Sequence, residues 1–437
     1  MSRRLRVIRR FAAITAAAVF SLTSAGTGVA ARQASPAAPA PPPRTTPVGF
    51  PQDVGPHDSE AVIEWWYFNA FLTGSKSGRK YAVVGSFFRT GIGARKGHYL
   101  LYALADLNAK KKTTYSVVDQ ANVELLRAYL PLAALQRPGD PEIKKLVALL
   151  QQKKLPAPHR ALSTTATITT KPDEPFAITM GKNALRCTSA DGRTWQAKLV
   201  GDDFNLDLTL RQPPERPAMR VGGEGKTGLN RPDDMFYVSL TRMQAEGELT
   251  RGGMKETVAG DGWLDRQWGT SWVVQDTGWD WFGLQLSDGS DLIVYRVRDN
   301  ASGKIRRAEA TLLRPDGTQI VDSAPTFTTR GAYTDPASRI TYPQTFLLTL
   351  PSTGHTLTIT PAFPDQTIPV LGIGTAIWEG AVMGRGTTRD GADLTGRGYM
   401  ELVGYRAKVG ATGAATKPGR RPAAPQKQGG TPKPGTR

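Results

Sequence analysis

Residues 260–298 constrain the fold of this chain more than any other stretch, because they combine a dense group of tryptophans with a strand-like alternation. Five of the nine tryptophans of the chain lie here. Apolar side chains alternate from Trp279 to Leu286, a Ser-Asp-Gly-Ser segment follows, and apolar side chains return from Leu292 to Val297. This pattern predicts a β-hairpin with a tight turn at residues 287–290.

The same alternation recurs along the rest of the chain. It is clearest at residues 204–210, where FNLDLTL has one apolar and one polar face. Helical spacing of apolar residues is found instead at residues 122–136 and 141–153. Further strands are predicted at residues 81–88, 99–107, 164–170, 235–243, 307–313, 345–350, 356–361 and 399–405. The sequence therefore predicts a mostly antiparallel β protein with a small helical insertion at 122–153.

Two distant segments share one order of features. Residues 64–89 and 280–298 each run from an acid through paired aromatics to a Gly/Ser turn, and then into an apolar strand that ends in arginine. Such a duplication predicts two similar β-barrels, each opened by an aromatic strand. We expect the first barrel at residues 48–272 and the second at residues 273–406.

The net charge of +18 lies mainly at the two ends of the chain. Residues 1–45 and 406–437 together carry fifteen basic side chains and no acidic one. The part between them is nearly neutral, so attraction to phosphates is a poor account of its function. We expect no nucleic-acid partner.

The N-terminus has the layout of an export signal. Basic residues reach Arg10, an apolar run too short to span a bilayer comfortably follows, and small residues surround Ala30. We predict a signal peptide at residues 1–31, read by the Sec or the twin-arginine pathway, and a secreted, periplasmic or cell-envelope protein. Residues 32–47 predict a Pro/Ala-rich linker.

The C-terminal residues 407–437 are rich in Gly, Pro, Lys and Thr, and predict a disordered basic tail. Such a tail either solubilises the protein or contacts an anionic membrane or envelope surface.

Local motifs for metals, cofactors and nucleophilic hydrolysis are missing from the sequence. The four histidines are far apart and Cys187 is the single cysteine, so we expect neither a metal site nor a cofactor. There is no G-x-S-x-G elbow, and the Gly-rich residues 222–226 lack the Ser/Thr spacing of a P-loop.

Four segments carry a family resemblance: HDSEAVIEWWYFNAFL, GDGWLDRQWG, GWDWFGLQLSDGSDLIVYRVR and GRGYMELVGY. In this order they resemble the AttH-type, lipocalin-like family, which includes carotenoid hydratases (hydroxyneurosporene synthases), exported proteins described as predicted secreted hydrolases, and pericyclase-like enzymes. The resemblance implies two calycin-like barrels packed together, with ligands within or between them. The hydratases are thought to use a histidine and an acid near the middle motif, where this chain has Arg266 and Gln267.

Three acids are candidates for catalysis: Asp265, Glu64 and Asp280. Burial in an aromatic pocket raises the pKa of a carboxyl group and makes it a general acid for an apolar substrate. The alternative for each is structural, since an acid beside tryptophan often accepts an indole N–H or pairs with an arginine. Asp265 is the first choice because it lies within the densest aromatic stretch.

Aromatic faces with a few polar groups are typical of pockets for apolar ligands, although packing inside a barrel explains such residues equally well. The candidate ligand-binding residues are Trp66, Tyr67, Trp263, Arg266, Trp268, Trp279, Trp281, Tyr295, Tyr399 and Glu401.

The sequence thus favours an exported two-barrel protein that binds an apolar or amphiphilic molecule, such as a lipid, isoprenoid or polyketide. Hydration, cyclisation or hydrolysis of that ligand is left open. The alternative is a non-enzymatic envelope protein that carries a lipid or contacts the membrane through its tail.

Overall fold

A computed structural model describes residues 44, 46–92, 95–136, 141–231, 234–270, 277–300, 302–371 and 376–407. The predicted export signal, most of the predicted linker, Trp272 and residues 408–437 lie outside these ranges. No helix in the described ranges is both long and apolar enough to cross a membrane.

The first sheet runs in the order β5-β4-β3-β2-β1-β13-β12-β10-β9-β8-β7-β6, with β11 beside β12. Its neighbours are antiparallel except for the short parallel pair β4 and β5. Its strands are β1 (Ile63–Gly74), β2 (Lys80–Ile92), β3 (Arg95–Asp106), β4 (Lys111–Val118), β5 (Arg160–Ala161), β6 (Thr167–Thr169), β7 (Phe176–Met180), β8 (Asn183–Cys187), β9 (Thr194–Val200), β10 (Phe204–Arg211), β11 (Met219–Arg220), β12 (Met235–Arg251) and β13 (Met254–Gly269).

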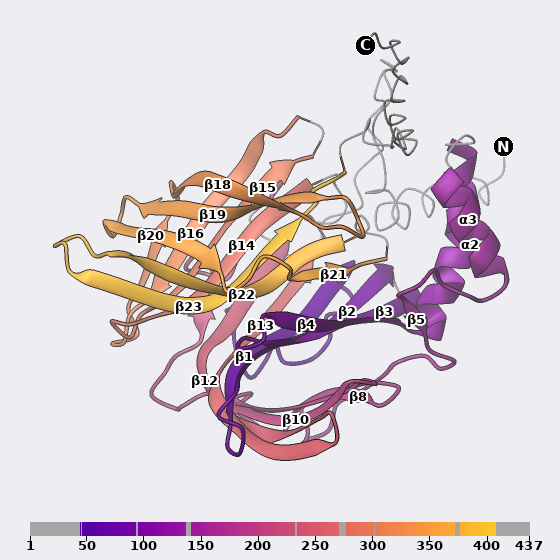
Figure 1. The fold of residues 1–437 in the computed structure, drawn as a ribbon, viewed down its shortest axis with the longest axis horizontal. Coiled ribbons are helices and arrows are strands. Elements are labelled where there is room, and N and C mark those ends of the chain that lie inside the picture. The colour runs from indigo at the N-terminus through magenta and orange to yellow at the C-terminus, as the bar shows by residue number, and fades with distance from the viewer. Residues whose placement is uncertain are drawn as a thin grey trace, which may run out of the picture.

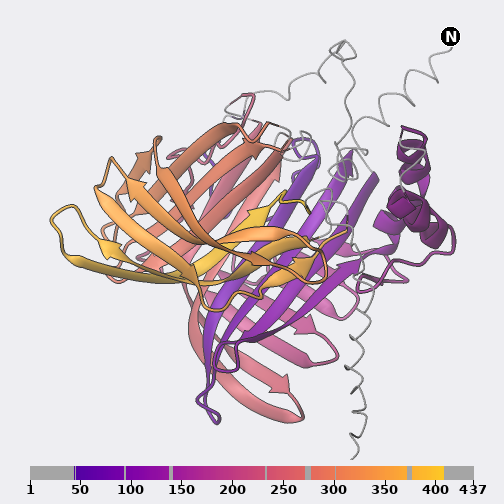
Figure 2. The same cartoon turned by 45° about the horizontal axis from the view of Figure 1, so that its top comes forward.

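The second sheet runs in the order β17-β16-β15-β14-β23-β22-β20-β19-β18, with β21 beside β22. Its strands are β14 (Thr277–Leu286), β15 (Asp291–Asp299), β16 (Ile305–Leu313), β17 (Gln319–Asp322), β18 (Thr326–Thr334), β19 (Thr341–Leu350), β20 (His355–Pro361), β21 (Thr367–Pro369), β22 (Ala376–Thr387) and β23 (Asp393–Val403). Figures 1 and 2 show two curled sheets packed against each other.

The helices α2 (Gln120–Gln136) and α3 (Pro141–Gln151) follow β4 and lie at one end of the first sheet (Figure 1). The predicted fold class, two lipocalin-like antiparallel β-barrels packed together with a small helical insertion in the first, is confirmed, and each sheet is curled into a half-barrel.

Four apolar clusters account for the packing, and the smallest lies around Phe236 and Trp268. One fills the concave side of the first sheet and includes Trp66, Phe176 and Trp195. A second fills the other half-barrel around Phe282 and Trp378. The third lies between the sheets and includes residues from both. Strands at this contact are therefore buried on both faces, which explains why their sequences are apolar without a clear polar side.

The two sheets repeat one arrangement of strands. The order β2-β1-β13-β12 in the first corresponds to β15-β14-β23-β22 in the second. The register repeats too: Glu64 on β1 lies opposite Arg89, and Asp280 on β14 lies opposite Arg296. The predicted hairpin is confirmed, since Trp279 pairs with Val297 and the turn lies between β14 and β15. Its two tryptophans face the other sheet.

Candidate functional site

A narrow cavity between the two sheets brings aromatic and acidic side chains together. The cavity itself has a volume of about 30 Å³, and the empty space amounts to about 480 Å³ when the open solvent at its mouth is counted. The wall from the first sheet has two rows that run across β2, β1 and β13. These rows are Phe88-Trp65-Gln267 and Ser86-Tyr67-Asp265. Ile63 and Tyr237 extend this wall, and Trp279, Trp281 and Glu401 form the opposite one.

Asp265 lies in a cage of three donors. Ser239 Oγ donates to one carboxylate oxygen at 2.5 Å, as does Trp263 Nε1 at 2.6 Å, and the Tyr237 hydroxyl donates to the other at 2.8 Å. Trp281 Nε1 donates in turn to the Tyr237 hydroxyl at 2.9 Å. Burial raises the pKa of Asp265 to about 6, against the lowering effect of these hydrogen bonds.

Glu401 faces Asp265 from the second sheet. It accepts a hydrogen bond from Trp279 Nε1 at 3.2 Å. Burial raises the pKa of Glu401 to about 7; the charge of Asp265 acts in the same direction, and the Trp279 hydrogen bond acts against it. Near neutral pH this carboxyl group therefore exists in both its protonated and its ionised form.

A second glutamate stands behind Glu401. Glu379 on β22 lies directly opposite Glu401 in the strand register, and it accepts a hydrogen bond from the Tyr67 hydroxyl at 2.9 Å. Burial and the nearby charge of Glu401 raise the pKa of Glu379 well above its ordinary value, although Tyr67 and Lys112 lower it. The three acids therefore share a poorly solvated region in which not all of them ionise readily.

The cavity reflects the internal duplication. Trp65 lies opposite Gln267 in the first sheet, and Trp281 lies opposite Glu401 in the second. All four line the cavity. The equivalent positions thus carry an amide on one wall and an acid on the other, so the site is symmetric in geometry but not in chemistry.

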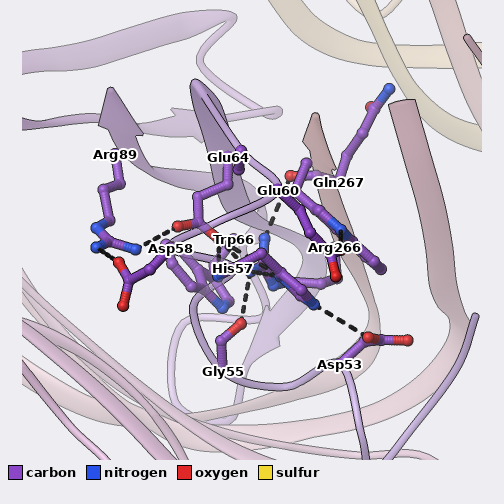
Figure 3. A network of polar contacts seen from close by, with 12 residues as sticks. Asp53, Gly55, His57, Asp58, Glu60, Glu64, Trp66, Arg89, Arg266 and Gln267 are labelled. Atoms are coloured by element: carbon purple, nitrogen blue, oxygen red, sulfur yellow. Dashed lines mark hydrogen bonds and ion pairs between the residues drawn. The ribbon is translucent and has the colours of Figure 1, made fainter. Parts of the chain in front are cut away.

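The opposite face of β1 and β13 carries a separate polar network (Figure 3). Glu64 pairs with Arg266 at 2.5 Å and with Arg89 at 2.6 Å. Arg266 also donates to the carbonyl of Gly55 and to His57 Nδ1, at 2.6 and 2.9 Å. Burial alone would raise the pKa of Glu64, but the charge of Arg266, its hydrogen bonds and the charge of Arg89 hold it well below its ordinary value.

Aromatic rings enclose this network. His57 stacks on Trp268 with ring centroids 4.0 Å apart, and the Arg266 guanidinium lies 4.0 Å from the centre of a Trp66 ring. Figure 3 also shows Gln267 pointing away from the network. This network holds the N-terminal arm, residues 53–62 before β1, against the first sheet. The structure therefore does not bring four of the candidates to the cavity: Glu64, Arg266, Trp66 and Trp268.

The other candidates divide between the cavity and its surroundings. Tyr67, Asp265, Trp279, Trp281 and Glu401 line the cavity. Trp263 donates a hydrogen bond to Asp265. Tyr399 lies beside Glu379: burial raises the pKa of Tyr399, and the charge of Glu379 raises it further. Asp280 is instead paired with Arg296 and Arg298, each at 2.7 Å, and the Tyr295 hydroxyl donates to Glu309 at 3.0 Å. These two lie outside the lining of the cavity.

Sequence reasoning missed Glu379 and six of the residues that line the cavity: Ile63, Trp65, Ser86, Phe88, Tyr237 and Gln267 were not among the candidates. Glu379 is a single acid in the otherwise apolar run AIWEGAV, and Ser86 is a single hydroxyl in AVVGSFF. An isolated polar residue within a doubly buried strand is the signal that could have identified both, because such a residue needs a partner.

Within the described ranges, no group of three or more His, Cys, Asp or Glu side chains is placed to hold a metal ion. The histidines serve other contacts: His98 Nδ1 lies 2.8 Å from Asp119, and His159 Nδ1 lies 2.8 Å from Ser116 Oγ. The chemistry available in the cavity is therefore that of carboxyl, hydroxyl and amide groups against aromatic walls.

Comparison with known proteins agrees with this architecture. The sequence profile of the AttH-like family matches residues 145–405. The solved structure of an AttH protein from Nitrosomonas europaea is 25% identical and aligns over 84% of this chain and 100% of its own, with a TM-score of 0.62. Kievitone hydratase from Nectria haematococca is 16% identical over 83% of this chain and 96% of its own, with a TM-score of 0.58. CghA is 14% identical over 85% and 96%, with a TM-score of 0.52. No curated protein matched the sequence.

Proposed function

This chain belongs to the AttH-like family, and on that premise we propose that its inter-sheet cavity binds an apolar or amphiphilic small molecule and performs acid–base chemistry of the hydration or cyclisation type on it. The observation that carries the proposal is the placement of Asp265 and Glu401 on the two sides of one aromatic cavity. Their pKa values of about 6 and about 7 suit proton transfer near neutral pH.

The two acids have different surroundings and so take different roles. Three donors stabilise the ionised form of Asp265, whereas one indole N–H contacts Glu401. Environments that separate two carboxyl groups in this way are a common basis for assigning an acid and a base. We assign protonated Glu401 as the general acid and ionised Asp265 as the general base.

In a hydration, Glu401 transfers its proton to one carbon of an alkene. A water molecule then adds to the cationic carbon and loses its own proton to the Asp265 carboxylate. The flat faces of Trp65, Trp279 and Trp281 would contact the apolar parts of the ligand and stabilise positive charge in the transition state. In a cyclisation, a carbon of the same molecule takes the place of the water.

The fold resemblance to a hydratase supports this class of reaction. A printed activity of a relative at 16% identity does not carry over by itself, because one fold hosts many chemistries. The proposal for this chain therefore depends on the acids and the aromatic walls.

The test is to incubate the protein with a hydrophobic extract of its native host in heavy-oxygen water and to follow products by mass spectrometry. Hydration incorporates one labelled oxygen into a product. We expect Glu401→Gln and Asp265→Asn each to reduce turnover by about a hundredfold or more while ligand binding persists. Glu309→Gln, a buried glutamate elsewhere between the sheets, is the control and should retain turnover.

The pH profile provides a second test. Turnover needs Asp265 ionised and Glu401 protonated, so the rate falls below a pH of about 6 and above about 7. Full activity of Glu401→Gln, or a flat profile between pH 5 and pH 9, would contradict the assignment. A ligand that co-purifies unchanged and never reacts would favour a binding protein instead.

A further inference from the structure

Two polar side chains in the cavity wall have no partner within the described part of the protein. The Gln267 side-chain amide nitrogen and the Ser86 hydroxyl oxygen are both buried and make no hydrogen bond there. Gln267 is 2% exposed and Ser86 is 6% exposed, and both line the cavity. A buried polar group without a partner loses its hydrogen bond to water and gains none in return, so each such group requires an explanation.

Within the two rows of the wall, the polar neighbours of these two groups are occupied elsewhere and the others are apolar. Asp265 accepts from its three donors, and the Tyr67 hydroxyl is directed to Glu379. Trp65 and Phe88 complete the row that contains Gln267. An amide nitrogen only donates, so the missing partner of Gln267 is an acceptor oxygen inside the cavity.

The charge of the cavity restricts what that oxygen belongs to. Asp265 and Glu401 line it, Glu379 stands behind them, and no lysine or arginine is among the described residues of the lining. A carboxylate or phosphate would add negative charge to a poorly solvated, acidic region whose lining supplies no cation to contact it. A carbonyl, hydroxyl or ether oxygen adds none.

We infer that the ligand is a neutral, largely apolar molecule that carries an oxygen acceptor, and that Gln267 binds this oxygen while Ser86 makes a second polar contact. The inference rests on the proposed function in taking the same cavity as the ligand site. It excludes pure hydrocarbons and anionic lipids as the preferred class. It also gives a role to Gln267, whose position in the first sheet is equivalent to that of Glu401 in the second.

Three probes of nearly the same shape test the inference by calorimetric titration of the full chain. Acetylnaphthalene has a neutral carbonyl, isopropenylnaphthalene replaces its oxygen with a methylene group, and the naphthoate ion carries a charge. We expect the ketone to bind about tenfold more tightly than the hydrocarbon, because a site built to hydrogen-bond an oxygen discriminates against an analogue that lacks it. Naphthoate should bind more weakly than the ketone at pH 8.

The Gln267→Leu variant should bind both neutral probes with similar affinity, and Ser86→Ala should reduce the preference for the ketone partially. Both variants remove a buried unpaired group, so both should fold and should shift the urea unfolding midpoint of the ligand-free protein upward. Gln244→Leu, which changes an exposed glutamine on β12, should retain the full preference.

Equal binding of ketone and hydrocarbon by the unmodified protein would overturn the inference, since it would mean that water satisfies the amide. A ketone preference that persists in Gln267→Leu would overturn it too, as would tighter binding of naphthoate. If the protein prefers the ketone but Glu401→Gln and Asp265→Asn retain full turnover, only the proposed catalysis is contradicted. Binding of none of the probes would contradict both.

Discussion

The two faces of the strand pair β1 and β13 hold acids of the same chemical kind in opposite electrostatic states. On one face Glu64 is neutralised by two arginines, and its pKa lies well below the ordinary value. On the other face Asp265 meets only neutral donors, and burial raises its pKa to about 6. The two acids are on adjacent strands, so the type of partner rather than depth of burial separates a structural acid from a reactive one.

Removal of the structural acid should have the largest effect. Glu64→Gln leaves the buried Arg266 without its ion-pair partner, and we expect a loss of about 3–5 kcal/mol in the free energy of unfolding at pH 7. Urea unfolding measures it. Because the pKa of Glu64 is lowered by folding, its contribution is present above an unfolded-state pKa of about 4.5 and is lost as the pH falls further.

Asp202→Asn is the matched control for this prediction, because it breaks the exposed ion pair between Arg160 and Asp202. It should leave the unfolding curve unchanged. An equally small effect of Glu64→Gln would remove the distinction between the two faces.

Removal of the reactive acid Glu401 should instead increase the free energy of unfolding. Folding raises the pKa of Glu401 from 4.5 to about 7, so its stabilising contribution is complete below pH 4.5 and is lost as the pH rises through 7. Glu401→Gln cannot ionise and should be more stable than the unmodified protein by about 3 kcal/mol at pH 8. This advantage should disappear towards pH 4. A constant difference at both pH values, measured by urea unfolding, would show that Glu401 does not titrate as described.

The smallest effect is expected on ligand affinity, when one tryptophan of the cavity and one of the Glu64 network are each replaced. Trp281→Phe shortens the cavity wall and removes the donor to Tyr237, so affinity for acetylnaphthalene should fall about fivefold to tenfold. Trp268→Phe changes the ring that stacks on His57 outside the cavity and should leave this affinity unchanged. Equal losses in both variants would place the probe outside the cavity. Calorimetric titration of the two variants with acetylnaphthalene measures both affinities.

Much of the fold was predictable because its signals are local. The alternation from Trp279 to Val297 defined the hairpin of β14 and β15, and the repeated order of acid, aromatics, turn and arginine predicted two similar halves. The register shows why the repeat is informative: in the first half Glu64 lies opposite the terminal Arg89, and in the second half Asp280 lies opposite Arg296 and also pairs with the terminal Arg298. A cross-strand ion pair constrains both positions at once.

The site was only partly predictable. Acids and aromatic residues in tryptophan-rich stretches are the candidates, and five of them line the cavity: Tyr67, Asp265, Trp279, Trp281 and Glu401. Glu64, Arg266, Trp66 and Trp268 satisfied the same criterion and lie in the other network. Alternation shows that Glu64 and Tyr67 point to opposite faces, but both faces are aromatic and buried, so the sequence contains no polarity contrast to tell them apart.

The sequence by itself determined the strands, their duplication and the alternation that sends neighbouring side chains to opposite faces, because these depend on short-range geometry. Only the tertiary structure decided which face became a cavity. The N-terminal arm brings His57 to one face of β1 and β13, and the second sheet covers the other with Glu401 and Glu379. Whether a buried carboxyl group is neutralised or left reactive depends on such partners, which come from distant parts of the chain and meet only on folding.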